Sequence, residues 1–167
     1  MLTRRQTTYG LLIGGFTMAG IGSIFGGGSK DHADETFPVK KTEAEWKVQL
    51  SPEAYYVLRE HGTERAGTSP LDNEKRKGIF VCAGCDTKLF ASDAKFDSGT
   101  GWPSFFQPLA GAVETSDDSK FFMRRVEVHC ANCGGHLGHV FEDGPKPTGQ
   151  RYCMNGASMK FRPDAGA

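Results

Sequence analysis

The sequence predicts a mainly β fold, built from small antiparallel sheets in a barrel-like arrangement and preceded by a short N-terminal helix. Glycine and phenylalanine are both abundant, with 22 and 12 residues respectively. Many glycines imply many turns and the phenylalanines can fill a core, a combination that suits a loop-rich β domain better than a helical bundle. Short apolar runs separated by turn residues also favour short strands. A chain of 167 residues accommodates one such domain with appendages.

Residues 1–29 are predicted to be a targeting signal rather than part of the fold. Arg4 and Arg5 precede a glycine-rich, mildly apolar stretch that carries no charged residue before Lys30. A charged segment followed by an apolar one is typical of targeting signals, and paired arginines at this place resemble a bacterial twin-arginine export signal. The alternative is a membrane anchor, because about 20 apolar residues can span a bilayer, and an uncleaved signal would serve as both.

This interpretation places the mature domain in the periplasm, or at the membrane facing the periplasm, with the twin-arginine export machinery as a partner. A cytoplasmic location is expected if the signal is misassigned. Residues 30–45 are charged and polar, and they are predicted to form a flexible linker. The folded domain is predicted to cover residues 46–163.

The domain is predicted to begin with a helix and to continue with short strands. Ser51 and Pro52 favour a helix start, as N-cap and first helical residue, and the helix should end before Gly62. A polar stretch over 62–77 predicts a surface loop, and a glycine-rich, aromatic stretch over 96–105 predicts a loop that displays side chains. Strands are predicted over residues 78–82, 121–128 and 151–161, the last with an irregularity at Gly156.

Four of the five cysteines form two Cys-x-x-Cys pairs, each followed by turn residues: Cys82 with Cys85, and Cys130 with Cys133. A two-residue spacer lets both sulfurs of a pair bind one metal ion, and four thiolates fit the tetrahedral coordination of zinc. Because four cysteines leave no open coordination position, one Zn²⁺ would be structural and would clip together two hairpins that are distant in sequence. The alternative is a pair of disulfides, which an exported protein can form.

The fifth cysteine, Cys153, stands between Arg151 and Asn155 at alternate positions. If this segment is a strand, the three side chains share one face, so a cation, a thiol and an amide would lie together. A nearby cation favours the thiolate, which is the nucleophilic form of cysteine. The alternative is a buried structural cysteine, since a free cysteine packs as a small hydrophobic residue.

Together these motifs resemble the type B methionine sulfoxide reductases, which reduce methionine R-sulfoxide. The resemblance covers residues 46–161 and leaves out only the signal and the linker. Each motif alone is weak, but their combination in this order is specific. The matching motifs are the two cysteine pairs, Ser-Gly-x-Gly-Trp-Pro-Ser-Phe at 98–105, His-Leu-Gly-His-Val-Phe at 136–141 and Arg-Tyr-Cys-x-Asn at 151–155.

The resemblance implies that Cys153 attacks the sulfoxide sulfur, releases methionine and becomes a sulfenic acid, the first stage of cysteine oxidation. It also implies that His136 and His139 bind and protonate the sulfoxide oxygen, directly or through water. Histidine suits this role because it exchanges protons near neutral pH. A histidine pair could instead bind a metal ion, but the four cysteines already satisfy zinc.

The substrate-binding residues implied by the resemblance are Trp102, Arg151 and Asn155. Trp102 would form an aromatic wall against the methyl group, although a lone tryptophan could equally pack in the core. Arg151 would favour the thiolate and Asn155 would position the substrate. Asp143 is expected to orient Arg151 or a water molecule.

The sequence departs from the family pattern at Thr100, where many relatives carry a cysteine that resolves the sulfenic acid, and at Glu142, where proline is common. Threonine cannot form the disulfide, because the attacking species in thiol–disulfide chemistry is a thiolate. We therefore expect an external reductant to restore the enzyme: a small thiol, or a redox protein of the thioredoxin or glutaredoxin type.

Two other classes of function remain open at this stage. One is a zinc-stapled β module that binds a protein partner without catalysis, since a fold alone does not determine function. The other is a thiol–disulfide oxidoreductase that cycles a Cys-x-x-Cys pair. The formal net charge is zero, with 20 basic and 20 acidic residues, which argues against a nucleic-acid binder. We expect a monomer whose substrates are oxidised proteins or peptides.

Overall fold

The computed structural model describes residues 37–119 and 125–166, which fall within one structural unit, Asp34–Ala167. The predicted signal at 1–29, the linker residues 30–36 and the first part of the predicted 121–128 strand lie outside these residues. Among the helices that are described, none is long and apolar enough to cross a bilayer.

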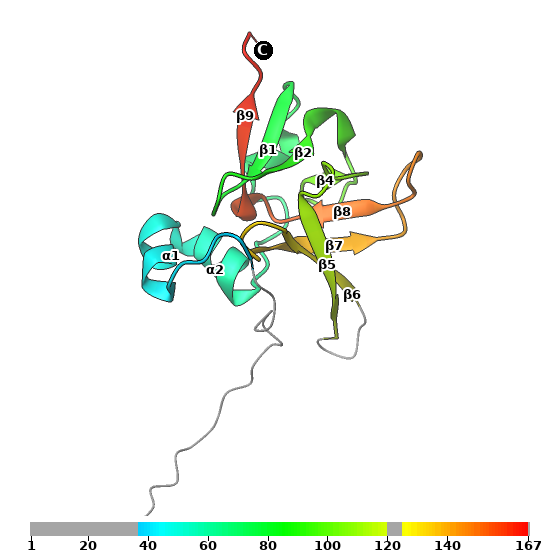
Figure 1. Ribbon diagram of the computed structural model, residues 1–167. Helices are drawn as coiled ribbons and strands as arrows, with labels where there is room; N and C mark the ends of the chain where they lie inside the picture. Colours follow the sequence, from blue (N-terminus) through cyan, green and yellow to red (C-terminus); the bar gives the residue numbers. More distant parts are fainter. Residues whose placement is uncertain (1–36, 120–124, 167) are drawn as a thin grey trace, which may run out of the picture. The chain divides into compact units, whose positions relative to one another are not determined.

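Two antiparallel sheets dominate the structure and confirm the predicted mainly β fold (Figure 1). A three-stranded sheet has the order β2-β1-β9, from Lys88–Ala91, Gly78–Cys82 and Met159–Pro163. A six-stranded sheet has the order β3-β4-β8-β7-β6-β5. Its strands are Lys95–Phe96, Ser104–Phe105, Arg151–Met154, His136–Phe141, Arg125–Cys130 and Val113–Asp118. Strands β2, β5 and β7 had no counterpart among the sequence predictions, and β3 and β4 lie at the two ends of the stretch predicted to be a loop over 96–105.

Two short helices precede the sheets, where the sequence predicted one. Helix α2, Pro52–Glu60, has Ser51 as its N-cap and ends at His61 in the left-handed conformation, as predicted. Helix α1, Glu43–Gln49, begins inside the predicted linker. A capping box between Thr42 and Glu45 stabilises its first turn, and Trp46 anchors it with a side chain that is 3% exposed.

The C-terminal segment links the two sheets. The sequence predicted one irregular strand over 151–161, but the chain forms β8, a short 3-10 helix η4 at Gly156–Ser158, and then β9. Strand β8 pairs with β4 and β7 in the larger sheet, whereas β9 pairs with β1 in the smaller one. The predicted irregularity at Gly156 is therefore the point where the chain leaves one sheet for the other.

Phenylalanines from both sheets form the centre of the core, as their abundance suggested. Phe90 of β2 stacks on Phe105 of β4, with ring centroids 4.3 Å apart, and Phe80 of β1 packs edge-on against the same ring. All three are fully buried. Each stabilises the fold by about 1.5–3 kcal/mol relative to an exposed side chain, so the core fixes β4 and, through the pairing of Phe105 with Tyr152, the neighbouring strand β8.

Candidate active site and metal centre

The four paired cysteines converge at the ends of β1 and β6. Their sulfur atoms all lie within 4.8 Å of one another. Cys82 Sγ is 3.8 Å from Cys133 Sγ, and Cys85 Sγ is 3.5 Å from Cys130 Sγ. Four sulfurs placed about 2.3 Å from one zinc ion in a tetrahedron would be about 3.8 Å apart.

These distances fit a tetrahedral metal ion and exclude disulfides, and all five cysteines are free. The disulfide alternative is therefore wrong. A metal ion held by these sulfurs would clip the β1–β2 hairpin to the β6–β7 hairpin, which are distant in sequence. A closed set of four thiolates has no position for substrate, so its role is structural.

A cavity of about 140 Å³ on the six-stranded sheet brings together four of the predicted site residues: Trp102, His139, Cys153 and Asn155. The register of the sheet explains this. His139 of β7 and Ser104 of β4 are the direct cross-strand partners of Cys153. Directly opposed side chains lie on the same face with Cβ atoms about 5 Å apart, so the thiol and the imidazole face the same space.

Cys153 is partly buried, and burial raises the pKa of its thiol above the ordinary value. Contacts with Thr100, Arg151 and Ser104 lower this pKa but do not offset burial. Arg151 therefore lowers the pKa of Cys153, as expected, but burial raises this pKa by more. The resting form of Cys153 is the thiol. Arg151 itself is held by two hydrogen bonds of 2.9 Å to Asp143, as expected, and lies over the ring of Phe141 at 4.4 Å.

His139 lines the cavity and is held by Asp118, which is not itself one of the lining residues. His139 Nε2 lies 2.8 Å from Asp118 Oδ2, a carboxylate on β5 that sequence reasoning did not identify. Burial lowers the pKa of His139, and the hydrogen bond to Asp118 offsets this only in part. The imidazole is therefore neutral near pH 7, with Nε2–H donating to Asp118 and Nδ1 left as the proton acceptor.

His136 is more deeply buried than His139. It is 2% exposed and is not among the residues that line the cavity. Its Nδ1 lies 2.6 Å from Glu127 Oε1, which also accepts from His61 Nδ1 at 3.1 Å. Burial opposes ionisation of Glu127, but the two imidazoles outweigh it and lower the pKa of this carboxyl.

An irregularity in the β6–β7 pairing accounts for the position of His136. Val128 pairs with Gly138 and His129 with His136, so Leu137 is an extra residue in β7. Such a bulge re-aims neighbouring side chains, and it sets the rings of His136 and His139 5.3 Å apart despite their spacing of three. Of the two histidines, His139 lines the cavity and His136 lies beside it, so the predicted contact of both with the sulfoxide oxygen stays a prediction.

Asn155 and Trp102 are both tied to Glu64, a residue that the sequence analysis missed. The Glu64 backbone N–H donates to Asn155 Oδ1 at 3.0 Å, and Trp102 Nε1–H donates to the Glu64 carbonyl at 3.2 Å. Residues 62–77 were predicted to be a surface loop, but Glu64 is 6% and Ser69 9% exposed. The loop packs inward because its polar groups find partners in the C-terminal segment.

Thr100 stands beside the candidate nucleophile. Its Oγ1 lies 3.9 Å from Cys153 Sγ, and a chain of hydroxyl contacts continues to Ser98 and Ser104 at 2.8 and 2.7 Å. A thiol at this position could reach Cys153, whereas the threonine hydroxyl supplies a hydrogen bond in its place.

Comparison with known proteins gives consistent results. The SelR domain family matches residues 50–163. A protein of Agrobacterium fabrum named peptide methionine sulfoxide reductase MsrB is 59% identical over 133 residues, 78% of this chain and 98% of that protein. Proteins of the same name from Methanosarcina mazei and Leptospira interrogans are 54% and 53% identical. These alignments cover 74% and 75% of this chain and 89% and 97% of those proteins.

Proposed function

Because the chain belongs to the SelR family, whose relatives are peptide methionine sulfoxide reductases of the MsrB type, we propose that it reduces methionine R-sulfoxide through Cys153. The chain is an enzyme that acts on methionine sulfoxide in peptides and uses a thiol reductant. One observation supports the catalytic assignment above others: Cys153 and His139 are opposed across two strands, in a cavity that also contains Trp102.

The reaction transfers the sulfoxide oxygen to Cys153. The thiolate sulfur attacks the sulfoxide sulfur and forms a transient S–S bond. The oxygen then moves to the Cys153 sulfur, so that the S–S bond and the S–O bond of the substrate break while an S–O bond to Cys153 forms. Methionine sulfur is reduced, Cys153 is oxidised to a sulfenic acid, and the thiol proton ends on the transferred oxygen. No other reactant is needed for this half of the cycle.

His139 is suited to carry that proton. Its lowered pKa leaves Nδ1 unprotonated, so it can accept the proton of Cys153 while the thiolate attacks, and then donate it to the oxygen. Asp118 holds the ring through Nε2 and stabilises the transient imidazolium. His136 acts behind this site, where Glu127 fixes the orientation of its ring.

Trp102, Asn155 and Arg151 define the binding site. The indole forms a wall for the substrate methyl group, and the Asn155 amide, which is 4% exposed, borders the same cavity. Arg151 lowers the pKa of Cys153 and so favours the attacking thiolate.

The four-cysteine group is proposed to hold one zinc ion. Four sulfurs in tetrahedral spacing are the preferred ligand set of structural zinc. The ion supplies no chemistry to the reaction; it fixes the hairpin of β6 and β7, and thereby His139, against the rest of the fold.

Regeneration is proposed to require an external thiol. Thr100 occupies the position nearest to Cys153 from which a resolving thiol could attack. The remaining cysteines belong to the metal group, so the sulfenic acid must be reduced by a small thiol or a redox protein.

Export to the periplasm is proposed from the sequence of residues 1–29. Arg4 and Arg5 before an uncharged stretch support a twin-arginine route. Changing both to lysine should retain the protein in the cytoplasm, as cell fractionation would show; normal export of the double variant would rule out this route.

The function is tested with separated epimers of a methionine sulfoxide peptide and dithiothreitol as reductant. The R epimer should be reduced and the S epimer left intact, because each sulfoxide epimer has its own enzyme. Cys153→Ser should abolish turnover and keep the fold. Turnover of both epimers, or activity of the serine variant near that of the wild type, would contradict the proposal; a non-catalytic interaction module would show no turnover at all.

A further inference from the structure

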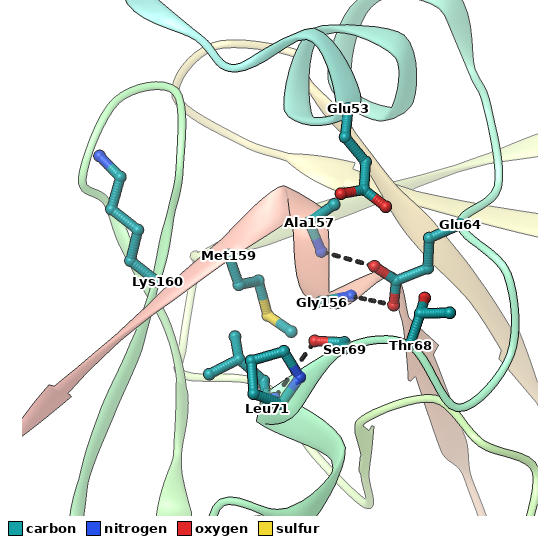
Figure 2. A pocket seen from close by; sticks show the side chains of 10 residues that line it. Glu53, Glu64, Thr68, Ser69, Leu71, Gly156, Ala157, Met159 and Lys160 are labelled. Carbon is teal, nitrogen blue, oxygen red and sulfur yellow. Dashed lines mark hydrogen bonds between the residues drawn. The ribbon is translucent and has the colours of Figure 1, made fainter.

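Glu64 connects three parts of the chain that otherwise approach the cavity separately. Its backbone bonds to the Asn155 amide and the Trp102 indole. Its side chain reaches in the opposite direction, and the carboxylate accepts the backbone N–H groups of Gly156 at 2.6 Å and Ala157 at 2.8 Å, as Figure 2 shows. The backbone of Glu64 thus holds the side chains of Asn155 and Trp102, and its carboxylate fixes that backbone against η4.

The approach of this loop to η4 depends on the absence of a side chain at Gly156. A Cβ there would lie within 3.0 Å of both Oγ and Cβ of Ser69, closer than real Cβ atoms come. Ser69 is fixed in turn, because its Oγ accepts from the N–H of Leu71. The loop that carries Glu64 and Ser69 therefore packs closely against η4, and the two hydrogen bonds from Gly156 and Ala157 also hold it there.

We propose that Glu64 is a positioning residue for the reduction of methionine R-sulfoxide, and that its carboxylate holds Asn155 and Trp102 in the geometry that binds the substrate. The inference rests on the proposed function of the cavity. It requires a carboxylate, because each of its two oxygens accepts one N–H group. An amide has only one such oxygen, and its NH₂ group would face an N–H donor.

The chain offers a matched control in the same region. Glu64 and Glu53 line a second cavity, of about 270 Å³, on the side of the loop shown in Figure 2. Glu53 projects from helix α2 and is exposed. Glu53→Gln removes the same charge from the same cavity without touching the bonds to Asn155, Trp102 or η4.

The test compares Glu64→Gln, Glu53→Gln and the wild type in steady-state reduction of an R-sulfoxide peptide with saturating dithiothreitol. Glu64→Gln should raise KM about tenfold or more, because a hydrogen bond to a charged group is lost and the binding side chains shift. A purely structural role would instead reduce the active fraction, which lowers apparent kcat and leaves KM unchanged. Glu53→Gln should match the wild type.

Two further measurements separate a change in substrate binding from a change in Cys153 or in folding. Iodoacetamide should alkylate Cys153 at the wild-type rate in Glu64→Gln, since the nucleophile itself is not moved. If Glu64→Gln does not fold, Glu64→Asp keeps the charge and one hydrogen bond, and it should raise KM by a smaller factor. A wild-type KM in the folded variant would overturn the proposal.

A binding measurement distinguishes failure of the positioning role from failure of the proposed function. A Cys153→Ser background removes catalysis, and binding of the R-sulfoxide peptide is then measured by calorimetry with and without Glu64→Gln. Weaker binding with the glutamine supports the positioning role whatever the turnover of the wild type, and equal binding contradicts it.

Discussion

Gly138 lies on β7 next to His139, the cross-strand partner of Cys153, and Gly138→Ala is the most informative single change. Gly138 pairs with Met154 and lines the catalytic cavity. A Cβ at this position would lie far inside 3.0 Å of the Cys153 carbonyl oxygen and 3.0 Å from Met154 Cα. Both of these atoms belong to the backbone of β8, so no side-chain rotation relieves the clash.

The size of the effect follows from these contacts. Ordinary contact begins at 3.4 Å, so β8 must move away from β7 by about 1 Å, and a misplacement of this size costs about 100-fold in rate. Over-packing should also destabilise the fold by about 1–3 kcal/mol. We therefore expect kcat/KM for the R-sulfoxide peptide to fall about 100-fold in the folded variant.

The assay is single-turnover reduction measured by rapid quench, normalised to protein that is folded by circular dichroism. Gly111→Ala is the control. Its φ of +66° makes alanine strained by about 1–2 kcal/mol, but no atom lies within 4 Å of the added Cβ. It should lose stability and keep the wild-type rate. If Gly138→Ala also keeps that rate, the spacing of β7 and β8 does not position Cys153, and the reasoning is wrong.

Three other predictions concern the metal, the thiol and the histidine. Elemental analysis should find one zinc ion in each wild-type chain and none in Cys133→Ser, which should also lose its cooperative thermal transition, because metal-binding energy is folding energy here; an unchanged melting curve would contradict this. Arg151→Met removes a group that lowers the pKa of Cys153, so the alkylation rate, which rises with pH as the thiolate forms, should reach its half-maximum at higher pH; a shift to lower pH would refute it. Asp118→Asn removes the carboxylate whose charge and hydrogen bond raise the pKa of His139 and should lower kcat about tenfold or more, with Cys153 alkylation unchanged; an unaltered kcat would exclude the pair from proton transfer.

Local signals in the sequence predicted the parts of the fold that depend on neighbouring residues. The Ser51-Pro52 start of α2 and the strand at 78–82 are of this kind, because capping and β propensity act over a few residues. The capping box at Thr42 was an equally local signal that was overlooked. The convergence of the cysteines was predictable because metal coordination restricts spacing and geometry strongly.

The rest of the site depends on strand register, which a single sequence does not determine. The pairing of His139 with Cys153 comes from the register of β7 and β8, and the bulge at Leu137 brings the ring of His136, which bonds to Glu127, beside that of His139. Glu64 was assigned to a surface loop because its partners, Asn155 and η4, lie far along the chain. The balance between burial and Arg151 at Cys153 likewise needs the three-dimensional environment.

The most direct test of the account is a single turnover with excess R-sulfoxide peptide and no reductant, followed by mass spectrometry of the intact protein under conditions that retain the metal. One methionine should form per chain, and a sulfenic-acid trap should label Cys153, because Thr100 cannot resolve it. An internal disulfide that involves Cys153, with zinc lost in proportion, would contradict the proposed regeneration by an external thiol. Absence of methionine would contradict the assignment of Cys153 itself.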